Sequence, residues 1–286
     1  MRVLLVHGRA QGGRDATELE AEWRGALEKG LLQAGLSLPA DTAFDFPFYG
    51  KTLDDEVIRL SQPHRADGAM GVAGDGEYAA FLGSVAREIA EKEGLSDEDI
   101  RAEMPVQDGT MGPENWAWVQ AIVRLIDRRW TPVASLAIEV ILRDVFLYLH
   151  SRAMRRAINA LVEARLTGEP TVVVAHSLGT VVCYDILKKR AHLDLRGFVT
   201  LGSPLGIRAV SGRLGMPVHV AGDRVWYNGY DERDIVALNP LDDTYFPTSP
   251  SIENDAGLDN DTDNRHGIIG YLDDRAVVTR IAEMLR

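Results

Sequence analysis

Short apolar runs punctuate the chain and are separated by longer stretches with apolar residues at helical spacing. The runs at residues 3–6, 172–174 and 197–201 are rich in valine, leucine and phenylalanine. Continuous runs of this length are typical of strands buried on both faces of a parallel sheet. By contrast, residues 19–32 place tryptophan or leucine about every four positions, as on the buried face of a helix. The pattern predicts an α/β fold with a mostly parallel central sheet.

A second strand is predicted at residues 44–50, where aromatic and polar positions alternate before Gly50. Pro47 has no backbone N–H, so this strand suits the edge of a sheet, where one side of the backbone needs no partner. Its aromatic side chains are expected to cover part of the core.

Residues from about 51 to 135 carry helical patterns, such as those at 54–60 and 78–89, with a glycine-rich break at 68–76. We interpret this stretch as a helical insertion that forms a cap above the sheet. The cap is expected to lie within a single domain that spans residues 1–286, because α/β folds of this length often form one domain.

Strongly apolar helices are predicted at 116–126 and 133–149, and a helical pattern continues from about 136 to 165. Trp116 and Trp118 are candidates for lining an apolar pocket, although an apolar helix face more often belongs to the core. The pattern at 136–165 contains a cluster of three arginines, which is typical of a solvated helix face but could also contact an anionic group: Arg152, Arg155 and Arg156.

The composition narrows the range of partners. Apolar residues make up 45 % of the chain and charged residues 26 %, as in an ordinary globular protein. The formal net charge of −12 argues against a nucleic-acid partner, which needs a basic surface.

The chain also carries few signals for export. Cys183 is its single cysteine, which excludes an intramolecular disulfide and fits a reducing compartment. The first strand begins at residue 3 and leaves no room for a signal peptide, and the longest uncharged run near the middle is too short to cross a bilayer. We therefore expect a cytoplasmic protein without a transmembrane segment.

Residues 171–180, with the sequence TVVVAHSLGT, read as a strand, a sharp turn and the start of a helix. Ser177 lies at the change of direction, with Ala175 and Gly179 two positions away on either side. Small residues are needed there because strand and helix approach closely at such a turn. The stretch resembles the nucleophile elbow of α/β-hydrolase serine esterases and lipases, with Ala175 in place of the usual first glycine. The alternative is a strand-to-helix turn that merely contains serine.

The resemblance implies an α/β-hydrolase fold, with a mostly parallel sheet and helices on both faces. It also implies an oxyanion hole built from two backbone N–H groups. One belongs to Leu178, which follows the serine, and the other to Arg9 in the loop after the first strand. His7 in that loop precedes the serine and is expected to shape the loop rather than to act in catalysis.

A serine nucleophile needs a histidine base and an acid that orients the base, and in this fold they follow the serine in the order acid, then histidine. Elimination leaves His266 as the base. The excluded histidines precede Ser177, follow it too closely or precede the best acidic loop: His7, His64, His150, His176, His192 and His219. Asp234 is the preferred acid because an apolar segment follows it directly, and Asp231 is the alternative.

Two competing readings fail on chemical grounds. Ser203 ends another strand, but Pro204 follows it and has no N–H to donate to an oxyanion. The alternating acids between 259 and 263 suggest a calcium loop, but Asn264 stands at the glycine position and Gly270 at the position of the bidentate glutamate. No metal or other cofactor is expected.

These features predict a serine hydrolase that cleaves carboxylic esters, similar to a carboxylesterase or lipase, through an acyl-enzyme. A phospholipase, thioesterase or acyltransferase with the same triad is an alternative, as is a non-catalytic binding protein on a hydrolase scaffold. The expected partner is a small-molecule or lipid ester. Peripheral membrane contact stays open, and the sequence does not indicate an oligomeric state.

Overall fold

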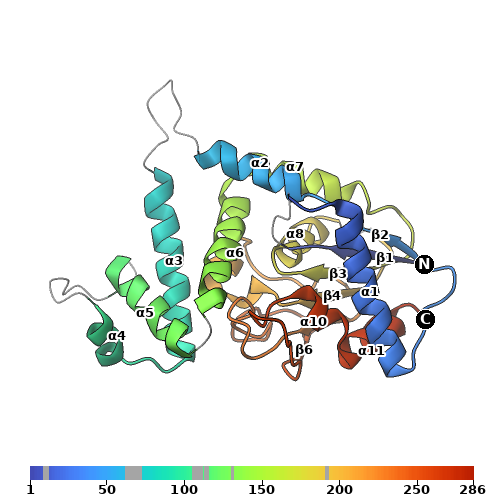
Figure 1. The fold of residues 1–286 in the computed structure, drawn as a ribbon. Coiled ribbons are helices and arrows are strands. Elements are labelled where there is room, and N and C mark those ends of the chain that lie inside the picture. Colours follow the sequence, from blue (N-terminus) through green and yellow to red (C-terminus); the bar gives the residue numbers. More distant parts are fainter. Residues whose placement is uncertain (9–12, 62–72, 105–111, 113–115, 130–131, 191–192) are drawn as a thin grey trace.

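The computed structural model describes residues 1–8, 13–61, 73–104, 112, 116–129, 132–190 and 193–286. Its centre is a six-stranded sheet in the order β2-β1-β3-β4-β5-β6, in which every neighbouring pair is parallel (Figure 1). The strands are β1 (Arg2–Val6), β2 (Ala43–Asp45), β3 (Thr171–His176), β4 (Leu195–Leu201), β5 (Trp226–Gly229) and β6 (Glu253–Asp255). The prediction of an α/β fold with a mostly parallel sheet is confirmed.

Helices connect the strands. They are α1 (Ala16–Ala34), α2 (Gly50–Ser61), α3 (Ala73–Lys92), α4 (Asp97–Glu103), α5 (Trp116–Arg129), α6 (Pro132–His150), α7 (Arg152–Glu163), α8 (Leu178–Leu187), the 3₁₀ turn η1 (Pro204–Gly206), α9 (Arg208–Ser211), α10 (Ile268–Leu272) and α11 (Arg275–Met284). None of the helices within the described ranges is both long and apolar enough to cross a membrane.

The central strands carry continuous apolar runs because each face of the sheet has its own core. In β1, Val3 and Leu5 join a cluster with α1, α10 and α11 on one face. Leu4 and Val6 point the other way, into a larger cluster that includes α8 and helices from the segment between β2 and β3. Successive side chains of a strand point to opposite faces, so two covered faces require an unbroken apolar run.

The second strand is shorter than predicted. β2 ends at Asp45, and Gly50 opens α2 instead of ending a strand. Pro47 has no N–H for a ladder, so it limits pairing beyond this point. The aromatic side chains nonetheless pack as expected, because Phe46 and Phe48 lie against the core on the α1 face.

The helical segment between β2 and β3 runs from α2 to α7 (Figure 1). It comprises the described helices of the predicted insertion at about 51–135 and the helices predicted after it, up to about 165. Figure 1 shows α3, α4, α5 and α6 grouped to one side of the sheet. Buried residues of this segment, including Phe81, Trp118 and Phe146, belong to the same hydrophobic cluster as one face of the sheet. Trp118 is thus a core residue, whereas the side chain of Trp116 lies outside the described part of the chain.

Two predicted helix boundaries were wrong. The pattern from 136 to 165 is divided, because α6 ends at His150 and α7 begins at Arg152. Ser151 caps α7, and its side chain accepts a hydrogen bond from the backbone N–H of Met154. α3 begins at Ala73 and so includes Gly74 and Gly76 of the predicted break, whose earlier glycines lie outside the described residues.

The strand order also fixes where a ligand would be expected. The chain moves from β1 to β2 on one side and to β3 on the other, so the order reverses between β1 and β3. In open parallel sheets, ligands bind at the carboxyl ends of the strands beside such a switch point. His7 and Gly8 follow β1 there, and Ser177 follows β3.

Candidate active site

Ser177 occupies the sharp turn between β3 and α8, as the sequence predicts. Its φ of 53° and ψ of −127° are unusual for a residue with a side chain, and Arg265 is the other non-glycine residue with positive φ in the described ranges. Such strain of about 1–3 kcal/mol persists where the surrounding structure enforces it, and it is concentrated at functional sites. The turn directs the serine out of the end of β3.

The turn depends on the small residue at 179. A Cβ atom added to Gly179 would lie 2.4 Å from the carbonyl oxygen of Val6 and 2.5 Å from that of His7. Glycine therefore lets α8 start directly against the end of β1. Gly8 is equally close, since a Cβ there would lie 2.7 Å from Cβ of Ser177.

His266 and Asp234 are brought together from two different loops. Asp234 follows β5 and His266 follows β6, and Nδ1 of His266 lies 2.7 Å from Oδ2 of Asp234. Both residues are buried. The other carboxylate oxygen, Oδ1, accepts the backbone N–H of Val236 at 2.9 Å. A carboxylate can only accept, so Nδ1 carries a proton, and Nε2 is the ring nitrogen that can act as a base.

The two atoms that would exchange a proton are both buried and have no hydrogen-bond partner among the described residues: Oγ of Ser177 and Nε2 of His266. Buried polar groups are normally paired, and unpaired ones are found at catalytic sites. His266 lies next to the serine's strand, because its ring centroid is 4.7 Å from that of His176. Catalytic hydrogen bonds are often long before substrate binds, so the missing bond does not exclude the pair.

Asp231 has a different environment from Asp234. Its carboxylate accepts the backbone N–H groups of Arg233 and Asn260, at 2.8 and 2.9 Å. Burial alone would raise the pKa of Asp231, but the hydrogen bonds from Arg233 and Asn260 outweigh this and hold the pKa below its usual value. Asp231 thus ties the loop after β5 to the segment that leads to His266, and the carboxylate at hydrogen-bond distance from His266 is Asp234.

Further contacts hold the loop of His266. Arg265, at φ 57°, pairs with Asp259 at 2.9 Å. The side chain of Asn264 accepts the backbone N–H of His266, and that of Asn260 donates to the carbonyl of Gly267 at 2.8 Å. Asp259, one acid of the rejected calcium pattern, is thereby paired with arginine. Within the described ranges, no group of three or more metal-ligating side chains is arranged to hold an ion.

The predicted oxyanion donors can be followed only in part. Leu178 is the first residue of α8, where backbone N–H groups have no partner within the helix. Arg9 and its neighbour Ala10 lie outside the described residues, as do His64 and His192. His7 holds the start of their loop, because its Nε2 accepts the backbone N–H of Tyr49 at 3.0 Å and its ring stacks on that of Tyr49.

Ser203 is engaged in structural contacts. Its Oγ lies 2.8 Å from Oγ1 of Thr180 and accepts the backbone N–H of Leu205 at 3.3 Å. Sequence reasoning excluded Ser203 because of Pro204, and the structure adds that its hydroxyl is already paired.

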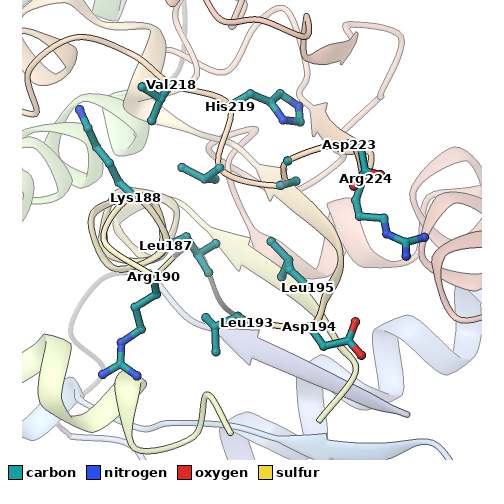
Figure 2. Close-up of a pocket in the computed structure, with 13 residues that line it drawn as sticks. Leu187, Lys188, Arg190, Leu193, Asp194, Leu195, Val218, His219, Asp223 and Arg224 are labelled. Carbon is teal, nitrogen blue, oxygen red and sulfur yellow. The ribbon is translucent and has the colours of Figure 1, made fainter. Parts of the chain in front are cut away.

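A cavity of about 420 Å³ lies elsewhere in the molecule. Figure 2 shows it between the end of α8 at Leu187 and Lys188, the start of β4 at Leu195, and the segment that contains His219. These residues lie near the amino ends of β4 and β5, whereas Ser177 lies at a carboxyl end. The cavity is therefore separate from the candidate active site.

Comparisons of the chain with protein-family models, with curated proteins and with solved structures give no match.

Proposed function

We propose that the protein is a serine hydrolase that cleaves carboxylic esters through an acyl-enzyme. The observation that carries the proposal is the hydrogen bond between Asp234 and His266 at the end of the sheet where strained Ser177 lies. The order serine, acid, histidine along the chain is that of α/β-hydrolases, and so is the strand–turn–helix setting of the serine. The six parallel strands with helices on both faces are compatible with that fold.

In the proposed reaction, Oγ of Ser177 attacks the ester carbonyl while Nε2 of His266 accepts its proton. Asp234 keeps the proton of the imidazole on Nδ1 and stabilises the imidazolium that forms. The imidazolium then returns the proton to the leaving alcohol, which departs from the tetrahedral intermediate. Water, activated by the same histidine, attacks the acyl-enzyme, and the acid is released as Ser177 is regenerated.

The oxyanion would be stabilised by the backbone N–H groups of Leu178 and Arg9. Each such donor contributes on the order of 3 kcal/mol to transition-state stabilisation. The position of Leu178 at the start of α8 supports its role, because the positive end of the helix dipole also favours negative charge there.

Part of the arginine cluster at 152–156 is engaged within the fold. A phospholipase could use these arginines to contact the phosphate of its substrate, but Arg155 is paired with the carboxylate of Asp185, with Nε 2.8 Å from Oδ2. Asn159 donates to the same carboxylate at 2.8 Å, so Asp185 of α8 holds α7 through two hydrogen-bonded side chains. Thioesterase and acyltransferase activities use the same triad and are distinguished by their products.

A fluorophosphonate probe tests the proposal, because it reacts with serines that a base has activated. Wild-type protein should be labelled at Ser177, as mapped by mass spectrometry, and Ser177→Ala should not be labelled. Ser203→Ala is the matched control, since it removes another buried serine near the end of a neighbouring strand and should leave labelling intact. Folded wild-type protein that resists the probe would instead favour a binding protein on this scaffold.

If Ser177 is labelled, the products from short-chain, long-chain, thioester and phospholipid substrates then define the reaction. Release of free acid from simple esters agrees with the proposal. Transfer of the acyl group to an added alcohol in preference to water would replace hydrolysis with acyl transfer.

A further inference from the structure

Tyr271 and His266 share a single oxygen of Asp234. The hydroxyl of Tyr271 lies 2.6 Å from Oδ2, and Nδ1 of His266 lies 2.7 Å from the same atom. Tyr271 belongs to α10, five positions after His266, and is fully buried. Asp234 is therefore held between two side chains from one segment.

The phenol also touches both loops that form the site. Its oxygen accepts the backbone N–H of Asp231 at 3.3 Å, in the loop of the acid. It lies 3.3 Å from the carbonyl oxygen of Arg265, which directly precedes the base. Tyr271 thus lies where the loops after β5 and β6 meet.

The hydroxyl proton of Tyr271 points to Asp234. Burial raises the pKa of Tyr271 well above its ordinary value, and the negative charge of Asp234 raises the pKa further, so the phenol keeps its proton. It has one proton to donate, and a charged acceptor at 2.6 Å forms a stronger hydrogen bond than a neutral carbonyl at 3.3 Å. Together with the N–H of Val236 on Oδ1, this leaves the carboxylate no free rotation.

We propose that Tyr271 is a positioning residue that, by donating its proton to Oδ2 of Asp234, fixes this carboxylate and limits how strongly it attracts the proton of His266. The inference rests on the proposed function, in which His266 is the base. Two donors on one oxygen share its negative charge, so the phenol weakens the pull of Asp234 on the imidazolium. Without the phenol, His266 would hold its proton more tightly and act as a base only at higher pH.

Other charged groups near the pair remain unchanged when the phenol is removed. The titratable and charged groups around Asp234 and His266 are Asp231, Glu232, Arg233, Arg265, His176 and, from α3, Lys92. Tyr271→Phe deletes the hydroxyl with its contacts to Asp234, to the backbone N–H of Asp231 and to the carbonyl of Arg265, and leaves these charged groups in place.

The test compares Tyr271→Phe with Tyr227→Phe in the full-length protein. Tyr227 is the matched control, because it is also buried in the same core and its hydroxyl donates to a carboxylate, Asp255, at 2.8 Å. The first measurement follows protonation of the His266 imidazole by NMR as a function of pH, with the signal identified by its loss in His266→Asn. The second follows the rate of fluorophosphonate labelling at Ser177 over the same pH range.

Tyr271→Phe should move both midpoints upward by roughly half to one pH unit. This size is expected because Asp234, the charged partner of His266, loses one hydrogen bond. Tyr227→Phe should leave both midpoints unchanged, even if it lowers the melting temperature as much. A folded Tyr271→Phe protein with the wild-type midpoint would overturn the inference and leave Tyr271 a structural residue.

The two measurements separate this inference from the proposed function. A shifted NMR midpoint in a protein that the probe never labels would support the contact between Tyr271, Asp234 and His266 and reject hydrolysis. If Tyr271→Phe does not fold, 3,5-difluorotyrosine at position 271 replaces it. The fluorines make the phenol a stronger donor, so the midpoint should move downward, and an unchanged midpoint would contradict the inference.

Discussion

Nε2 of His176 lies 2.8 Å from the carbonyl oxygen of His266, so the residue before the candidate nucleophile is hydrogen-bonded to the backbone of the candidate base. Burial holds the pKa of His176 well below its ordinary value, and the neighbouring His266 lowers it further. His176 is therefore neutral, and its one proton is on Nε2, because a carbonyl oxygen can only accept. The bond couples the position of His266 to the end of β3.

Replacing His176 should slow the labelling of Ser177 if the new side chain cannot donate a hydrogen bond to the carbonyl of His266. His176→Ala removes the bond to the loop of His266, and a base displaced by about 1 Å loses on the order of a hundredfold in rate. His176→Gln places an amide N–H close to the position of Nε2 and should retain most of the wild-type rate. Equal labelling rates for the two variants would show that this bond does not position the base.

The same histidine should make stability depend on pH. In the unfolded chain it takes up a proton below about pH 6.5, whereas the folded protein keeps it neutral because the folded pKa is depressed. The unfolded state then binds more protons, so the free energy of unfolding falls on acidification by up to about 1.4 kcal/mol per pH unit. Urea unfolding at pH 8, 7, 6 and 5 should show a shallower fall for His176→Gln than for wild type. Parallel curves would contradict this prediction.

Substitution of the two candidate acids, Asp234 and Asp231, should have different effects. Asp234→Asn removes the charge that orients His266, and in comparable triads the asparagine substitution lowers turnover about 10⁴-fold. Asp231→Asn leaves that contact in place and loosens the connection to Asn260 and Arg265, so its main effect should be on thermal stability. The measurement is the labelling rate and the melting temperature of both variants. A larger rate loss in Asp231→Asn would make Asp231 the acid.

Gly179 should tolerate no side chain. In Gly179→Ala the new methyl would lie 2.4 Å from a backbone oxygen of β1, so either α8 or β1 must move. We expect a loss of about 3 kcal/mol or more in the free energy of unfolding, at the upper end for overpacking. Gly25 is the matched control, because it is in the interior of α1 with nothing within 4 Å of the added atom. Gly25→Ala should stabilise the protein by about 1 kcal/mol, as alanine does in a helix.

The sequence was most informative where burial determines residue type. β1, β3 and β4 could be predicted because a strand covered on both faces needs an unbroken apolar run. β6 was missed, since Glu253, Asn254 and Asp255 are all polar and the strand is defined only by pairing with β5 at the edge of the sheet. The division between α6 and α7 was missed, because the helical pattern runs on through Ser151, where one helix ends and the next is capped.

Some residues of the candidate site could be predicted from the sequence and others could not. Ser177 could be singled out because its turn constrains several adjacent residues, and His266 and Asp234 because they follow it in a fixed order. The contributions of His176 and Tyr271 could not be predicted. In the sequence, neither residue can be told from an ordinary buried side chain. Its hydrogen-bond partner depends on how the loops after β5 and β6 meet.

The pairing of the sheet also has a consequence for synthesis. Arg2 in β1 pairs with Thr171 in β3, and β2 reaches only part of β1 on its other side. At about 5–20 residues per second, synthesis of the roughly 170 residues between Arg2 and Thr171 takes on the order of ten to thirty seconds. Throughout this interval, the apolar strand Val3–Val6 has been made but its central partner has not. The nascent chain should therefore depend on a chaperone, or on early packing of α1, to keep this strand from pairing with another chain.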